Sequence, residues 1–131
     1  MTEPLYPPPK PLEWDRSRTV FDHVHIGVRD PDASRAFYAT VLEPLGIPLV
    51  WQDERGAQFG GLILTADREP SAPVRIAFVA DSREQVEAFH RAGIEAGYRD
   101  GGAPLDTGRG YCAAVLLDPD GNSIEAVRRE T

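Results

Sequence analysis

Four side chains of the kind that bind ligands or metal ions lie in three predicted strands. His23 and His25 alternate with apolar residues along one strand, so their side chains share one face. Arg75 alternates with apolar residues in a second strand, and Glu125 stands in the middle of the last strand. Imidazole, guanidinium and carboxylate groups bind anions, exchange protons or bind metals. We therefore expect these four residues to line one small-molecule cavity.

The elements that position these residues occur twice in the same order. The first set is a strand at 21–28, a helix beginning at 30–34 and ending at Gly46, and short strands at 48–52, 57–59 and 62–66. The second set is a strand at 73–80, a helix beginning at 81–82 and ending at Gly97, and strands near 98–99, at 111–117 and at 123–128. The two helix-ending glycines are 51 residues apart, as are Asp30 and Asp81. This repetition predicts an α+β fold that arose by internal duplication.

Further candidate ligand contacts flank the predicted strands. The glycine-rich segment 100–110 predicts a long flexible loop that borders the site. Arg109, near the end of this loop, and Tyr111, directly after it, lie at the mouth of the last hairpin, where they either close on a ligand or form a rim. Trp51 and Phe59 belong to the first set of short strands, where each supplies an aromatic wall or packs in the core.

Composition limits the classes of partner. The chain has 131 residues, 41% of them hydrophobic and 27% charged, which is typical of a single globular domain. A net charge of −7 argues against nucleic acid and anionic membranes as partners. A single cysteine, Cys112, permits no intrachain disulfide, so we expect a cytoplasmic protein. No apolar run reaches the ~18–20 residues that a membrane-spanning helix needs, and we expect no signal peptide.

Residues 1–19 form a separate Pro-rich arm. Five prolines favour an extended backbone there. Apolar side chains are also present, at Leu5, Tyr6, Leu12 and Trp14. The arm is either a frayed tail or a segment that packs on its own domain or on a partner subunit.

Segments at both ends of the main domain resemble one protein family. The strings DHVHIGVRD (22–30), SRAFY (34–38), LEPLG (42–46) and LDPDGNSIEA (117–126) resemble motifs of the vicinal oxygen chelate superfamily. This superfamily includes glyoxalases, bleomycin-resistance proteins, fosfomycin-resistance enzymes and extradiol dioxygenases. The resemblance covers roughly residues 20–128 and implies two paired βαβββ modules, 20–70 and 73–128, in one domain of residues 20–131. It further implies a cupped, barrel-like mixed sheet, a small-molecule ligand and a homodimer.

The resemblance also implies a metal-ligand set that this chain keeps only in part. His23 matches the first-strand histidine of the family's metalloenzymes, and Glu125 matches the glutamate of the last strand. Arg75 stands where a second histidine is usual, and residues 60–66 offer no carboxylate to match a further glyoxalase ligand. A guanidinium repels a dication and pairs with a carboxylate instead. If His25 serves as a third ligand, the set becomes two histidines and one carboxylate, which suits Zn, Ni, Mn or Fe.

Two functions from different classes fit these residues. In the first, a divalent metal held by His23 and Glu125 binds two substrate oxygens, and the protein is a metal-dependent lyase, isomerase or dioxygenase. In the second, the protein is a metal-free binder that sequesters a drug or metabolite. Arg75 then binds an anionic group, and the aromatic residues contact the rest of the ligand.

Overall fold

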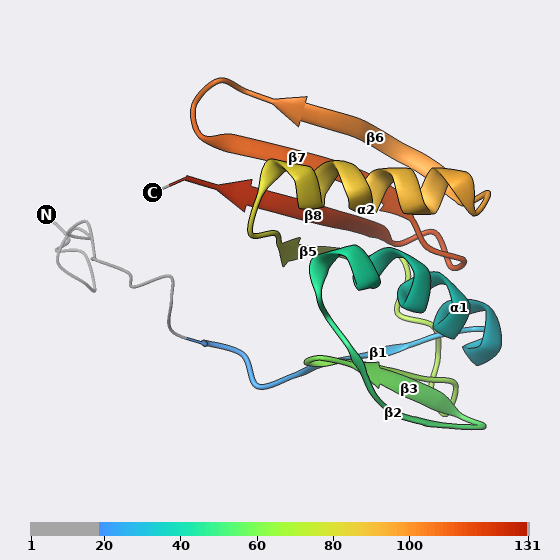
Figure 1. Cartoon of the computed structure of the whole chain (residues 1–131). Helices are drawn as coiled ribbons and strands as arrows, with labels where there is room; N and C mark the ends of the chain where they lie inside the picture. Colours follow the sequence, from blue (N-terminus) through green and yellow to red (C-terminus); the bar gives the residue numbers. More distant parts are fainter. Residues whose placement is uncertain (1–18, 131) are drawn as a thin grey trace, which may run out of the picture.

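The computed structural model describes residues 19–130, so nearly all of the predicted arm and Thr131 lie outside the described part (Figure 1). The first module comprises β1 (Val24–Gly27), α1 (Pro31–Leu42), the 3₁₀ helix η1 (Glu43–Leu45), β2 (Leu49–Asp53), β3 (Gly56–Phe59) and β4 (Leu62–Thr65). The second comprises β5 (Arg75–Val79), α2 (Arg83–Glu95), β6 (Arg99–Asp106), β7 (Tyr111–Leu117) and β8 (Ser123–Arg129).

The two modules share one topology. The strand order is β1-β4-β3-β2 in the first sheet and β5-β8-β7-β6 in the second. In each sheet the first strand pairs in parallel with the last, and the other pairs are antiparallel. The helices α1 and α2 lie side by side between the two sheets, each against its own sheet (Figure 1). The predicted α+β fold of two βαβββ modules is confirmed.

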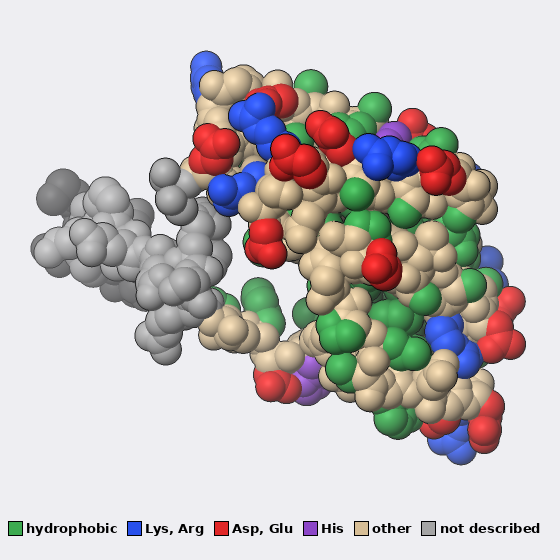
Figure 2. Space-filling model, in the orientation of Figure 1, with side chains coloured by type: hydrophobic (Ala, Val, Ile, Leu, Met, Phe, Trp, Pro, Cys, Tyr) green, Lys and Arg blue, Asp and Glu red, His purple; other side chains and the backbone are tan. Residues whose placement is uncertain are grey.

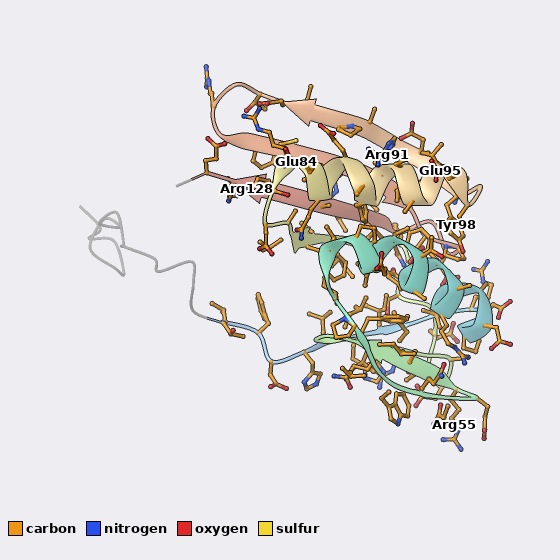
Figure 3. All side chains as sticks on the ribbon, viewed as in Figure 1. Arg55, Glu84, Arg91, Glu95, Tyr98 and Arg128 are labelled. Carbon is orange, nitrogen blue, oxygen red and sulfur yellow. The ribbon has the colours of Figure 1, made fainter. Side chains whose placement is uncertain are left out.

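Capping residues begin both helices, and a shared core holds them on the sheets. The Asp30 side chain accepts hydrogen bonds from two backbone amides of α1, and Ser82 caps α2 in the same way. Phe37 of α1 packs edge-to-face on Tyr98, which follows α2 and lies beside α1 (Figure 3). Gly93 allows α2 to approach β7 closely, because an added Cβ would lie 2.4 Å from a methyl group of Leu116. The modules therefore share one hydrophobic core.

Two strand boundaries differ from the predictions. Most of the predicted loop 100–110 is strand β6, which pairs with β7. This strand escaped the sequence pattern because nearly all its residues are exposed and Gly101 and Gly102 coincide with shifts in register. At the other end of the chain, β1 begins at Val24, so His23 precedes the strand. Within residues 19–130, no helix is long and apolar enough to cross a membrane.

Candidate functional site

Each sheet has a face that turns away from the helices, and these open faces carry most of the predicted site residues. Ile26 is buried against the helices, whereas its neighbour His25 is only half-buried. Register places His25, Ile63, Gln58 and Trp51 in one row across the first sheet. On the second sheet, register gives Arg75, Ala77, Glu125, Val115 and Tyr111 the same open face.

His23 precedes β1 and lies at the edge of a cleft between the modules. Its Nδ1 is 2.8 Å from the carboxylate of Asp22, and about half of its side chain is exposed. The cleft has a volume of about 290 Å³, and its walls are mostly apolar side chains from the start of β1, from β4 and from β5. Figure 2 shows the molecule hollowed between its two modules.

His25 belongs to a chain of hydrogen bonds on the first sheet. Its Nε2 is 2.7 Å from Oγ1 of Thr65, and that hydroxyl is 2.5 Å from Oδ1 of Asp67. The hydrogen bond from Thr65 holds the pKa of Asp67 below its usual range, and Arg68 and His25 act in the same direction. Asp67 is therefore a carboxylate at neutral pH.

Glu125 is paired with a tyrosine on the second sheet. The Tyr111 hydroxyl donates to Oε1 of Glu125 across 3.1 Å, and the Arg129 guanidinium lies 4.8 Å from the Tyr111 ring centre. Burial and the adjacent Glu125 raise the pKa of Tyr111. Arg75 is exposed and stands two register positions from Glu125 on the same face, but the described residues contain no Arg75–Glu125 ion pair.

The predicted metal ligands do not lie together in the described part of the chain. His23, His25 and Glu125 bond to Asp22, Thr65 and Tyr111 respectively. Across residues 19–130, no three histidine, cysteine or acidic side chains are close enough to hold a metal ion. The structure therefore does not assemble the expected set of His23, Glu125 and His25.

The remaining predicted contacts have different surroundings. Trp51 is 44% exposed on β2, at the end of the row that contains His25. Phe59 is buried in the core near Tyr38, and part of it borders the cleft between the modules. Arg109 is exposed in the turn between β6 and β7, where its backbone amide donates to the Thr107 hydroxyl across 3.3 Å.

A buried carboxylate that sequence reasoning assigned only to a turn positions the second half of the site. Asp118 is 1% exposed and accepts hydrogen bonds from the Tyr38 hydroxyl (2.6 Å), the Asn122 amide side chain (2.9 Å) and two backbone amides of the turn. Asn122 in turn accepts from the backbone amide of Val74 across 2.8 Å. This network joins α1 to the β7–β8 hairpin and fixes β5 beside β8, and so places Arg75 on the same face as Glu125, two register positions away.

Sequence reasoning also missed Thr65 and Asp67. It searched residues 60–66 for a carboxylate and found none, but Asp67 lies one residue beyond that window and turns back to Thr65. The sequence did contain a signal for Thr65. Ile63 is the register partner of His25 in the parallel pair, and alternation places Thr65 on the same face as Ile63.

Comparison with known proteins assigns the family. The family model described as "Glyoxalase/Bleomycin resistance protein/Dioxygenase superfamily" matches residues 20–126. The chain belongs to this family. It is 34% identical to a glyoxalase/bleomycin resistance protein from Albidiferax ferrireducens T118, with a TM-score of 0.69 over 84% of this chain and 98% of that one. No curated protein matches.

More distant solved structures share the fold. A lactoylglutathione lyase from Agrobacterium tumefaciens is 21% identical, with a TM-score of 0.63 over 84% of this chain and 93% of that one. TioX from Micromonospora sp. ML1 is 18% identical, with a TM-score of 0.66 over 86% of this chain and the whole of the other. Identities this low show the fold alone.

Proposed function

We propose that this protein is a metal-free binder of a small organic molecule, held on the open faces of its sheets. The observation that carries the proposal is the position of Arg75, which shares the open face of the second sheet with Glu125. A guanidinium keeps its charge at every physiological pH, so it opposes a dication and favours an anionic ligand group. The Glu125 carboxylate is already engaged by Tyr111, which gives it a ligand-orienting role.

The second candidate is a metal-dependent enzyme of the lyase, isomerase or dioxygenase type. It is supported by the family match and by the retention of His23 and Glu125 at the two positions that the family resemblance assigns to metal ligands. One of the similar structures is named a lactoylglutathione lyase and another an oxidase. For this candidate, side chains from a second copy or a different arrangement of the modules must complete the ligand set.

We also propose a homodimer in which a second copy packs over the open faces and encloses the ligand site between the two copies. The support is the large apolar side chains that these faces expose: Trp51 is 44% exposed, Val79 78% and Leu105 66%. Light scattering at tens of micromolar protein is expected to give twice the monomer mass, and Val79→Lys is expected to shift the mass toward the monomer. A monomer in wild type would contradict the dimer.

Metal titration distinguishes the two candidates. Calorimetry with Zn²⁺, Ni²⁺ and Mn²⁺ is expected to show weak binding to wild type and at least about tenfold tighter binding to Arg75→His, which removes a charge and adds a nitrogen ligand. Arg55→His is the matched control, because Arg55 is exposed at the far end of the first sheet (Figure 3). Stoichiometric metal in wild type that Glu125→Gln releases would contradict the binder and support the enzyme.

A further inference from the structure

Three polar side chains form a continuous hydrogen-bonded chain on the open face of the first sheet, and neither function above uses it. Asp67 lies at one end, the Thr65 hydroxyl in the middle and the His25 imidazole at the other end. Thr65 is buried, whereas His25 is half-buried beside the open face. The two contacts measure 2.5 Å and 2.7 Å, so both are short for hydrogen bonds.

The chemistry of these groups fixes the position of each proton. The Asp67 carboxylate only accepts hydrogen bonds, so the single hydroxyl proton of Thr65 points to Asp67. Thr65 then has only a lone pair to offer His25, and the Nε2 of His25 must be the donor. The opposite arrangement would leave two oxygens 2.5 Å apart with no proton between them. A neutral His25 therefore carries its proton on Nε2.

This proton arrangement determines what His25 presents to a ligand. Its other ring nitrogen, Nδ1, has no hydrogen-bond partner among residues 19–130. Because the proton is on Nε2, this nitrogen is a bare acceptor. We propose that Thr65 and Asp67 are positioning residues that hold His25 as an acceptor, so that the first sheet selects small molecules carrying a hydroxyl or N–H group. The selectivity rests on the proposed small-molecule function, whereas the fixed tautomer does not.

The neighbours of His25 favour a flat ligand. In the row across the sheet, Ile63 and Gln58 separate His25 from the indole of Trp51. Three strand spacings give a distance of about 14 Å between the ends of this row. An aromatic molecule of two or three rings spans much of that distance, with its donor group at His25 and its rings toward Trp51.

The tautomer is tested directly by nitrogen NMR of the histidine side chains. In wild type, the His25 spectrum is expected to show the proton on Nε2. Thr65→Val keeps the side-chain shape and removes the hydroxyl, so the preference for Nε2–H should fall. Asp67→Ala should also lower the preference for Nε2–H, because the freed Thr65 proton can then point to His25. Thr40→Val, which removes a hydroxyl on α1, is the control and should leave His25 unchanged. A proton on Nδ1 in wild type, or an unchanged preference in both variants, overturns the positioning role.

Ligand selection is tested with a matched pair of aromatic probes. The probe 2-naphthol carries a hydroxyl, and 2-methoxynaphthalene has the same rings without a donor. Wild type is expected to bind naphthol about tenfold more tightly, and Thr65→Val to reduce this ratio. Equal binding of the two probes by wild type overturns the selectivity alone. If neither probe binds wild type at about 1 mM, the small-molecule role of this face is overturned, while the tautomer result still stands on its own.

Discussion

The two modules use one backbone plan for different purposes. Equivalent helix positions carry Tyr38 in α1 and His90 in α2. Tyr38 is fully buried and donates across the module boundary to Asp118. His90 bonds to Asp100 of its own module, at a surface where the Asp100 side chain is about half exposed. The comparison teaches that duplication preserved the topology, while the first helix acquired the contact that fixes the modules relative to each other.

The open faces of the two sheets also carry different polar groups. The first sheet presents an imidazole held by a hydroxyl and a carboxylate, and the second presents a carboxylate held by a tyrosine. One face therefore offers an acceptor nitrogen, and the other offers an anionic oxygen close to Arg75. The exposed face of α2, which carries Glu84, Arg91 and Glu95, has no comparable arrangement (Figure 3).

The largest effect is expected from removing the buried carboxylate that joins the modules. Asp118→Ala leaves the Tyr38 hydroxyl, the Asn122 side-chain amide and two backbone amides without their acceptor. Because unsatisfied buried polar groups are costly, we expect a loss of about 3–5 kcal/mol in the free energy of unfolding, measured by urea denaturation. The control is Asp120→Ala in the same turn, whose two carboxylate oxygens share long hydrogen bonds from the Arg29 amide, at 3.4 and 3.2 Å. A loss below about 1 kcal/mol for Asp118→Ala would show that this network does not hold the modules together.

A smaller loss is expected when only the cross-module hydroxyl is removed. Tyr38→Phe keeps the ring in the core and deletes one hydrogen bond to a carboxylate, so about 1.5–3 kcal/mol should be lost. Burial, and next the Asp118 charge, raise the pKa of Tyr38 well above its usual value. The folded protein therefore keeps this proton where the unfolded chain releases it.

This difference in proton binding predicts an alkaline dependence with a definite sign. Wild-type stability should fall as pH rises above about 10, by up to about 1.4 kcal/mol per pH unit from this residue. In Tyr38→Phe this component should be absent. Denaturation at several pH values between 9 and 11 measures it, and equal slopes in the two proteins would mean that Tyr38 ionises freely in the fold.

The sequence predicted those features that depend on local periodicity. Alternation placed His25 opposite Ile26 and gave Arg75 and Glu125 one face, as the strand register shows. It failed for β6, where exposure on both sides and paired glycines remove the periodic signal. It also failed for Asp118, because one of the hydrogen bonds that satisfy this buried carboxylate comes from Tyr38, 80 residues away, and no local pattern records that contact.

The smallest effect is expected at the exposed counterpart of the Tyr38 contact. The hydrogen bond from His90, and next that from the Gly102 amide, lower the pKa of Asp100. A lowered pKa means that the folded state favours the carboxylate. This contribution is therefore present above the unfolded pKa of about 4 and is lost as pH falls through the lower folded value.

Asp100→Asn should accordingly flatten the stability profile below pH 4 and change neutral-pH stability far less than Tyr38→Phe does, because solvent screens an exposed pair. Denaturation profiles of both variants from pH 2 to 7 make the comparison, with Asp32→Asn as an exposed control on α1. If Asp100→Asn proves as costly at pH 7 as Tyr38→Phe, the second helix depends on its polar contact as strongly as the first, and the proposed asymmetry between the modules is wrong.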